Sequence, residues 1–200
     1  MVLLAVWLVG SLAIAQAAEK KLVHFNEVVR GLAYTPQYIA LANDYFGDEG
    51  LKIDLRIAWG GTKSMTGLLT KRDDISLLGP EATYYAIEQG VPDPALNFAQ
   101  LTNRDVTFLV GRPGGPKFTW EGLKGKNILS ASSGSTPHMV LLWVLARHGL
   151  TPGKDVTVTP IRPPGSAPAF IEGRGDFIAV WEPFVSQIEK MGKGVTVNSL

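Results

Sequence analysis

Four turns in the chain carry residue types that bind small polar molecules, because each joins a β-patterned segment to a helix start. They span residues 34–36 (YTP), 60–62 (GGT), 79–81 (GPE) and 134–137 (GSTP). The first N–H groups of a helix lack partners inside the helix and carry a partial positive charge, so they bind anions and polar groups. In open parallel sheets, ligands bind at the carboxyl ends of the strands, where such helices begin. The pattern predicts a ligand-binding edge, with ordinary helix caps as the alternative.

Signatures of catalysis are missing from the sequence. Residues 130–136 (SASSGST) lack the Gly-Lys-Ser/Thr ending of a phosphate-binding loop, and neither a Gly-x-Ser-x-Gly elbow nor an HExxH motif occurs. The lack of cysteine argues against a thiol nucleophile, a disulfide framework and a lipidated N-terminal cysteine. Of the three histidines, only His138 lies beside a predicted helix start. The sequence therefore predicts binding without enzyme activity, cofactor or metal.

Composition and charge narrow the class further. The 200 residues have a mass of 21.6 kDa and carry 19 basic and 18 acidic side chains, for a formal net charge of +1. This near-neutral balance argues against strong attraction to nucleic acid or to acidic lipid. A chain of this length buries about 70% of its unfolded surface, so it needs no disulfide or metal to fold.

The first 18 residues have the pattern of an export signal. An apolar run from Val2 to Ala15 is shorter than the roughly 20 residues of a membrane-spanning helix. Ala15, Gln16 and Ala17 then fit a signal-peptidase site. We expect residues 1–18 to be a signal peptide and the protein to be periplasmic without a lipid anchor. A buried or membrane-anchoring helix is the alternative.

The rest of the chain alternates between strand and helix patterns, which predicts an α/β fold with parallel sheets. Strands are expected at residues 21–29, 51–58, 75–78, 96–101, 106–111, 127–131, 156–161, 177–180 and 195–198. Helices are expected at residues 37–46, 63–71, 82–89, 138–148, 167–172 and 184–191. A stretch rich in glycine and proline at 112–116 (RPGGP) marks a boundary between a first lobe at 19–111 and a second lobe at 112–200.

Several segments, in a fixed order along the chain, carry a family resemblance. They are 31–51 (GLAYTPQYIALANDYFGDEGL), 60–61 (GG), 75–84 (ISLLGPEATY), 98–105 (FAQLTNRD), 120–128 (WEGLKGKNI), 134–150 and 175–184 (GDFIAVWEPF). Their order and spacing resemble the NMT1/THI5-like and SsuA-like substrate-binding proteins of ABC transporters, which serve uptake of nitrate, sulfonate, taurine and thiamine-precursor pyrimidines. The resemblance implies a type II periplasmic binding protein fold, with two α/β lobes, a hinge and a ligand between them. It also implies a monomer that meets an ABC permease and its ATPase subunit.

Two departures from the family pattern change what is expected. Family members run well past 200 residues, and their chain returns from the second lobe to complete the first. We therefore expect a C-terminally truncated chain whose incomplete first lobe exposes apolar surface. The cysteine-rich cluster of the THI5 pyrimidine synthases is also missing, which argues for binding and against that enzyme activity.

Candidate ligand-binding residues follow from the turns and the matching segments. In the first lobe they are Tyr34, Thr35, Pro36, Tyr38, Gly60, Gly61, Thr62, Gly79, Pro80, Glu81 and Tyr84. In the second lobe they are Ser133, Ser135, Thr136, His138, Trp181 and Glu182. Ordinary packing in the core or on the surface is the alternative for Tyr38, Tyr84 and Trp181.

The character of the ligand stays open at this point. Hydroxyl groups at Ser133, Ser135 and Thr136 suit nitrate or a sulfonate, whereas carboxylates at Glu81 and Glu182 would repel an anion. Carboxylates beside tyrosine and tryptophan rings suit a flat solute with N–H donors, such as an aminopyrimidine, unless Glu81 only caps its own helix. The expected function is the extracytoplasmic solute-binding component of an ABC importer. The alternatives are a pyrimidine- or menaquinone-pathway enzyme on the same fold, or a sensory ligand-binding module.

Overall fold

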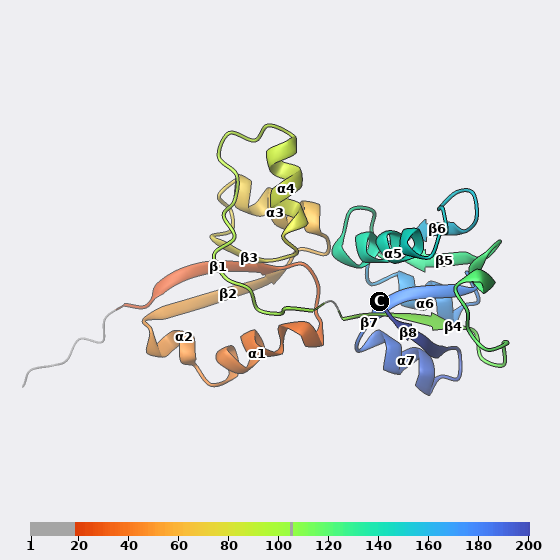
Figure 1. Cartoon of the computed structure of the whole chain (residues 1–200). Helices are drawn as coiled ribbons and strands as arrows, with labels where there is room; N and C mark the ends of the chain where they lie inside the picture. Colours follow the sequence, from red (N-terminus) through yellow and green to blue (C-terminus); the bar gives the residue numbers. More distant parts are fainter. Residues whose placement is uncertain (1–18, 105) are drawn as a thin grey trace, which may run out of the picture.

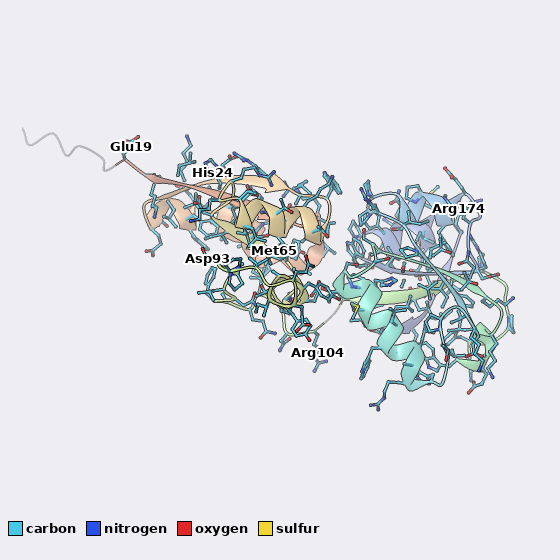
Figure 2. All side chains as sticks on the ribbon, turned by 90° about the horizontal axis from the view of Figure 1, so that it is seen from above. Glu19, His24, Met65, Asp93, Arg104 and Arg174 are labelled. Carbon is cyan, nitrogen blue, oxygen red and sulfur yellow. The ribbon has the colours of Figure 1, made fainter. Side chains whose placement is uncertain are left out.

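The computed structural model describes residues 19–104 and 106–200, so the expected signal peptide lies outside the described residues. Two α/β lobes lie side by side, and each is built on its own sheet (Figures 1 and 2). We call residues 19–104 the first lobe and residues 106–200 the second lobe. The α/β architecture predicted from the sequence is confirmed.

The first lobe holds a three-stranded parallel sheet in the order β2-β1-β3. Its strands are β1 (Lys21–Glu27), β2 (Leu51–Ile57) and β3 (Ile75–Leu77). Helices α1 (Thr35–Ala42) and α2 (Tyr45–Asp48) lie on one face, and α3 (Gly61–Leu69) and α4 (Glu81–Glu88) lie on the other (Figure 1). A 3-10 turn, η1 (Leu32–Tyr34), leads into α1. The carboxyl ends of the strands point toward the second lobe, so the loops that follow them can reach it.

The second lobe holds a five-stranded sheet in the order β6-β5-β7-β4-β8. Its strands are β4 (Thr107–Gly111), β5 (Asn127–Ser130), β6 (Thr157–Pro160), β7 (Phe177–Trp181) and β8 (Val195–Ser199). Its helices are α5 (Thr136–Arg147), α6 (Ser166–Ile171) and α7 (Phe184–Lys190), with a 3-10 turn η2 (Glu121–Leu123) before β5. Strand β5 pairs in parallel with β6 and β7, whereas β4 is antiparallel to β7 and β8. The expectation of parallel sheets therefore holds for only part of this lobe.

Two strand expectations differ from the structure. Residues 96–101 form no strand, because no other described segment pairs with them and Leu96 and Phe98 are 85% and 77% exposed. The apolar surface expected on the first lobe is present at these two residues. Strand β4 was expected in the first lobe, but its backbone pairs with β7 and β8, so the change of sheet precedes Thr107.

One helix expectation also needs correction. The helix expected at 37–46 is divided into α1 and α2, because Asp44 adopts a left-handed backbone with φ of 53°. Such a conformation cannot continue a right-handed helix. The other expected helices are present, with ends that differ by at most two residues.

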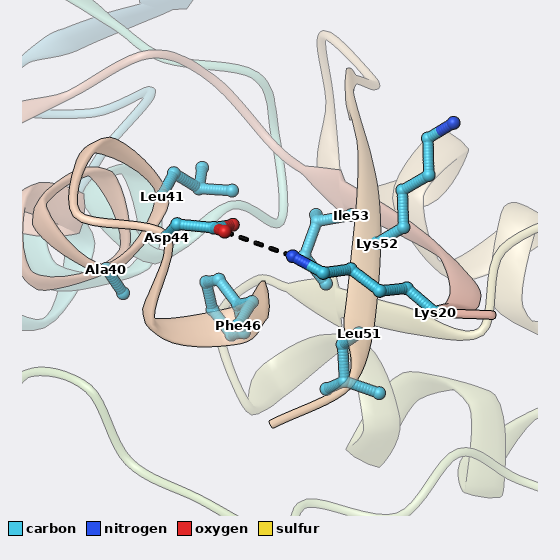
Figure 3. A pocket seen from close by; sticks show the side chains of 8 residues that line it. All are labelled: Lys20, Ala40, Leu41, Asp44, Phe46, Leu51, Lys52 and Ile53. Carbon is cyan, nitrogen blue, oxygen red and sulfur yellow. Dashed lines mark hydrogen bonds and ion pairs between the residues drawn. The ribbon is translucent and has the colours of Figure 1, made fainter. Parts of the chain in front are cut away.

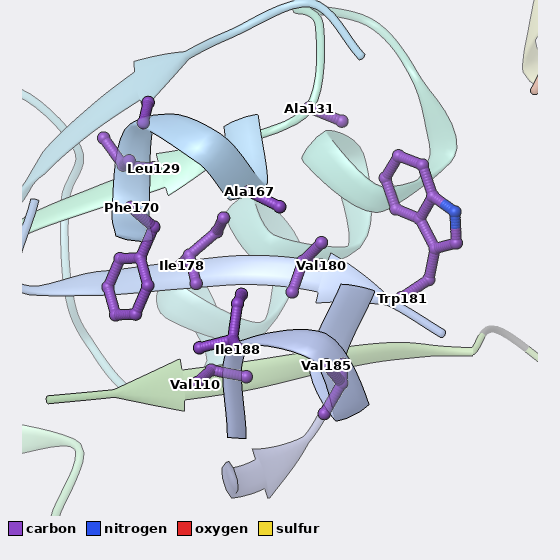
Figure 4. Close-up of a cluster of buried hydrophobic side chains, with 11 residues drawn as sticks. Val110, Leu129, Ala131, Ala167, Phe170, Ile178, Val180, Trp181, Val185 and Ile188 are labelled. Carbon is purple, nitrogen blue, oxygen red and sulfur yellow. The ribbon is translucent and has the colours of Figure 1, made fainter. Parts of the chain in front are cut away.

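The apolar core lies mainly in the second lobe, where two clusters of buried side chains flank the sheet. Phe170, Ile178 and Ile188 are fully buried in the cluster drawn in Figure 4. Burial of a side chain of this size contributes roughly 1.5–3 kcal/mol. The second lobe is therefore a packed scaffold against which the loops of the first lobe can be placed.

Candidate ligand site

The two lobes meet along a line of contacts that we call the seam, formed by Gly31, Glu81, Tyr85, Gly134, Thr136 and Trp181. Across it, the Thr136 hydroxyl donates a 2.8 Å hydrogen bond to Glu81 Oε1. A Cβ on Gly79 would overlap both the Glu81 carboxylate and the Thr136 hydroxyl, so glycine leaves room for this contact. The seam thus joins the start of α4 to the start of α5.

Tyrosine and tryptophan rings extend the seam on either side of this hydrogen bond. Tyr85 Cε2 lies 3.6 Å from the position of a Cβ on Gly134, and Trp181 Nε1 lies 3.6 Å from the position of a Cβ on Gly31. Trp181 is 7% exposed, and its buried Nε1–H finds no acceptor among the described residues. A buried indole N–H usually has a hydrogen-bond partner, so this donor is available to a ligand.

Glu27, the last residue of β1, has a buried carboxylate. Glu27 is 0% exposed, and its Oε2 accepts hydrogen bonds from Gln37 Nε2 at 3.0 Å and from the Tyr38 hydroxyl at 2.9 Å. Arg30 Nε lies 3.0 Å from Glu27 Oε1, so the charge is paired. Buried Gln37 also has an Oε1 that accepts no hydrogen bond among the described residues. The arrangement fixes a carboxylate and a free amide acceptor at the carboxyl end of the strand.

Two phenol groups lie close to this carboxylate. Burial raises the pKa of Tyr34, and the negative charges of Glu27 and Glu81 raise it further. Burial also raises the pKa of Tyr38, and the hydrogen bond from its hydroxyl to Glu27 raises it further. Both phenols therefore stay protonated at neutral pH and can donate hydrogen bonds.

The structure brings some of the predicted site residues together at the seam. Glu81, Thr136 and Trp181 lie on it, and Gly79 lies beside the hydrogen bond between Glu81 and Thr136. Tyr34 belongs to the same region, because the charge of Glu81 influences its phenol. Residues from both lobes therefore converge where the sequence predicts a ligand, although their roles in binding stay a prediction.

Other predicted residues of the first lobe have local partners or face solvent. The Thr35 hydroxyl donates to the carbonyl of Leu32 at 2.6 Å, at the start of the helix that contains Pro36. Tyr84 is 61% exposed, and its neighbour Tyr85 makes the contact with the second lobe. Gly60, Gly61 and Pro80 lie at the starts of α3 and α4, and Thr62 lines a separate pocket beside α3.

Several predicted residues of the second lobe are also held locally. The Ser135 hydroxyl donates to the carbonyl of Ser132, and exposed Ser133 lies in the same turn. Buried His138 has its Nδ1 2.9 Å from the Ser130 hydroxyl, and burial lowers the pKa of the His138 imidazole.

Glu182 is engaged at the start of α7. Its Oε1 and Oε2 accept hydrogen bonds from the hydroxyl and the backbone N–H of Ser186, at 2.9 and 3.1 Å. It has the geometry of a local helix cap, and its place in a ligand site stays a prediction.

Sequence reasoning missed four residues of this region. Glu27, Arg30 and Gln37 form the buried carboxylate cluster, and Tyr85 reaches Gly134. One signal was available, because Asn26 and Glu27 are adjacent polar residues at the carboxyl end of a predicted strand. Polar residues at the carboxyl end of a parallel strand lie where ligands bind in such sheets.

Other features of the described residues lie apart from the seam. A pocket of about 250 Å³ lies between α2 and β2, where Lys20 Nζ forms a 3.0 Å ion pair with Asp44 (Figure 3). It is lined by none of the predicted site residues. Within the described residues there is no group of three or more acidic, histidine or cysteine side chains placed to hold a metal ion. No helix in that part of the chain is both long and apolar enough to cross a membrane.

Comparison with known proteins gives matches over most of the chain. The profile of the NMT1-like family matches residues 17–199. YtlA of Bacillus subtilis (strain 168), named as a binding protein without a stated ligand, is 42% identical over 178 residues, which cover 88% of this chain and 53% of that protein. The taurine-binding periplasmic protein of Escherichia coli (strain K12) is 31% identical over 163 residues, which cover 80% of this chain and 49% of that protein. The chain therefore spans about half the length of the curated relatives it matches.

Solved structures of periplasmic binding proteins have the same fold. The nitrate-binding protein NrtA from Synechocystis PCC 6803 has a TM-score of 0.73 at 16% identity, over 90% of this chain and 52% of that one. The aliphatic sulphonate binding protein SsuA from Escherichia coli has a TM-score of 0.64 at 19% identity, over 90% of this chain and 60% of that one. At such identities the likeness shows the fold alone, and it confirms the type II periplasmic binding protein fold expected from the resemblance.

Proposed function

Because the chain belongs to the NMT1-like family, we propose that it is the solute-binding component of an ABC importer and holds its solute between the two lobes. One observation carries the proposal: polar groups from both lobes meet at the seam, and the buried Trp181 N–H there has no partner among the described residues. Relatives named as binding proteins support it. A solute that contacts both lobes favours the closed arrangement of the lobes. The closed arrangement would then distinguish the solute-bound protein from the free one.

The unpaired groups indicate what kind of solute would fit. The Trp181 N–H needs an acceptor, whereas Gln37 Oε1 needs a donor. The Glu81 carboxylate accepts one hydrogen bond, from Thr136, and forms no ion pair within the described residues. A solute with N–H donors at one end and an acceptor at the other would satisfy all three. This favours an amine-bearing sulfonate or an aminopyrimidine over nitrate, which has no N–H donor.

Calorimetric titration of the purified chain tests this proposal. The panel is taurine, its amine-free analogue ethanesulfonate, a 4-aminopyrimidine and nitrate. We expect binding of at least one amine-bearing compound, with unfolding shifted by about 2.7 kcal/mol at a solute concentration 100 times the dissociation constant. Equal binding of ethanesulfonate and taurine would contradict the solute class, and turnover of any compound would contradict a role limited to binding.

Two substitutions locate the solute at the seam. Trp181→Phe keeps an aromatic ring but removes the unpaired N–H, and Glu81→Gln removes the charge. Each should weaken binding about tenfold, the usual effect of losing a hydrogen bond to a charged or buried group. Trp143→Phe is the matched control, because Trp143 is 62% exposed on α5. If the control weakens binding as much as Trp181→Phe does, the solute is not at the seam.

The expected cellular location and protein partners follow from the same proposal. The chain would act as a monomer in the periplasm and deliver its solute to an ABC permease and its ATPase subunit. Osmotic-shock fractionation of cells that make the protein tests the location. Recovery only with the cytoplasm would contradict the importer role and favour the enzyme alternative.

A further inference from the structure

A second pocket lies on the first lobe, between α3 and the β2 edge of the sheet, and encloses about 390 Å³. Its polar lining residues include Asn26, Arg56, Thr62, Lys63, Arg72 and Asp73. Three cationic side chains thus face one carboxylate. None of the seam residues lines this pocket, so it is independent of the proposed solute site.

The cations of the pocket are held in different ways. Arg56 Nε donates to Asp54 Oδ2 at 3.0 Å, and Arg72 Nη2 donates to Asp73 Oδ2 at 2.9 Å. Lys63, in the first turn of α3, pairs with no acidic side chain among the described residues. Carboxylates that anchor two guanidinium groups limit the side-chain entropy lost when an anion binds them.

The pocket floor is a buried polar network around Asn26. Its Nδ2 donates to Asp73 Oδ2 at 2.8 Å, and its Oδ1 accepts from the Ser76 hydroxyl at 2.6 Å. The Ser64 hydroxyl also contacts Asn26 Oδ1. These bonds fix the Asp73 carboxylate beneath the cations. Burial opposes ionisation of Asp73, but hydrogen bonds from Arg72 and Asn26 outweigh it and lower the pKa of the carboxyl.

One atom of this network lacks a partner. Asp73 is 3% exposed, and its Oδ1 accepts no hydrogen bond among the described residues. Arg56 Nη1 lies 3.8 Å from it, which is too long for a direct hydrogen bond. A third polar atom placed beside this contact could form a hydrogen bond with each of the two groups. An atom that accepts from Arg56 and donates to Asp73 would complete the network.

We propose that this pocket binds a protonated oxyanion, either hydrogen phosphate or the singly protonated form of a phosphomonoester, at a site separate from the seam. The guanidinium groups and the Lys63 ammonium balance the ligand's charge, and its O–H donates to Asp73 Oδ1. Guanidinium groups match the geometry of phosphate oxygens. Sulfate carries no proton at neutral pH, so it would place an unprotonated oxygen against an ionised carboxylate.

Calorimetric titration of the full chain with inorganic phosphate and with sulfate, at matched ionic strength, tests the ligand class. We expect phosphate to bind at least tenfold more tightly than sulfate. Lys63→Gln should weaken phosphate binding at least fivefold without touching the buried network. Lys52→Gln, on an exposed position of β2 outside this pocket, is the matched control. Sulfate binding as tight as phosphate, or equal effects of the two lysine substitutions, would overturn the proposal.

Asp73→Asn tests the role of the unpaired oxygen. We expect this variant to lose the preference for phosphate over sulfate. Should it fail to fold, the phosphate-to-sulfate ratio of the native chain and of Lys63→Gln still decides the matter. The solutes of the seam serve as a further control, because their binding should be unchanged in Lys63→Gln, so the two sites can fail separately.

A sedimentation assay distinguishes two sources of the phosphate group, a lipid headgroup and free phosphate. The chain is spun with phosphatidylcholine vesicles that contain or lack phosphatidic acid, with and without free phosphate. Sedimentation that free phosphate reverses assigns a lipid headgroup to the pocket, and phosphate binding without sedimentation assigns free phosphate. Sedimentation with phosphatidic acid that free phosphate does not reverse would contradict the proposed pocket.

Discussion

The two lobes of this protein bury opposite kinds of side chain. In the second lobe, two clusters of apolar residues pack on the sheet, and many of their members are fully buried. In the first lobe the only buried hydrophobic side chains are Val23, Met65 and Ala86, among residues 19–104. Its other buried side chains are polar, namely Asn26, Glu27, Gln37, Ser64 and Asp73.

This difference separates stability from recognition. Apolar burial contributes about 25 cal/mol per Å² and needs no specific partner, so it makes a strong scaffold. Buried polar groups contribute little net stability, but each one left unpaired costs about 1–3 kcal/mol, so they impose a defined geometry. We infer that the second lobe supplies most of the folding energy, whereas most of the buried polar side chains of the first lobe fix local geometry.

The largest expected effect comes from the core of the second lobe. Phe170 is fully buried, and the Arg112 guanidinium lies 3.7 Å from the centre of its ring. Phe170→Ala should cost about 3–5 kcal/mol of unfolding free energy in urea titration. Phe98→Ala on the exposed face of the first lobe should change it by less than about 0.5 kcal/mol. Similar losses for both variants would break the contrast between the lobes.

The polar interior of the first lobe is tested by Glu27→Ala. This change leaves the Gln37 amide and the Tyr38 hydroxyl without their acceptor, at an expected cost of about 2–3 kcal/mol. Glu27→Gln keeps an acceptor oxygen of nearly the same size, so we expect a loss of only about 1 kcal/mol. Urea titration distinguishes the two, and equal losses would mean that packing, rather than hydrogen bonding, holds this cluster.

Acid should weaken the two lobes over different pH ranges. Burial lowers the pKa of His138 in the second lobe below its unfolded value of about 6.5. The unfolded chain then binds the extra proton first, so stability is complete above about pH 6.5 and falls as the pH drops. Asp73 in the first lobe also has a lowered pKa, and its contribution is lost only below its unfolded value of about 3.9.

Urea midpoints measured from pH 7.5 to pH 3 check this order. The native chain should begin to lose stability as the pH falls below about 6.5, and His138→Gln should remove only this early loss. A variant curve parallel to the native curve throughout would show that His138 does not cause the early loss.

The smallest expected effect concerns the contact between the lobes. Thr136→Val removes the hydroxyl that bonds Glu81 and keeps the shape of the side chain, so it should weaken the contact by about 1 kcal/mol. Because the chain has no cysteine, one introduced cysteine in each lobe can carry a fluorescent label. Energy transfer between the labels should report more separated lobes in the variant. Unchanged transfer would mean that this hydrogen bond does not bias the lobes.

Much of the fold could be predicted from local patterns in the amino-acid sequence. The alternation in residues 51–58 predicts β2, and proline at the start of 137–148 predicts α5, because strand and helix periods are properties of the chain itself. A strand was also expected at residues 96–101, and it is not formed. A strand needs a neighbour for its backbone, and the described residues supply none there.

The candidate site was predictable only in outline. Helix starts after strands indicated which loops meet, and Glu81, Thr136 and Trp181 do lie at the junction. No local pattern distinguishes Tyr84 from Tyr85, although only Tyr85 reaches the second lobe, because the direction of a side chain depends on how its helix packs. Glu27 was missed for the same reason, since a glutamate at a strand end is exposed in most proteins and fully buried here.

The amino-acid sequence was sufficient for the alternation of strands and helices and for the α/β class, because hydrophobic period and turn chemistry act between near neighbours. The packing of the lobes settled which strands share a sheet, which carboxylates are buried and which polar atoms stay unpaired. These features join residues far apart in the chain, as Glu81 and Thr136 show, and such contacts exist only once both lobes are folded.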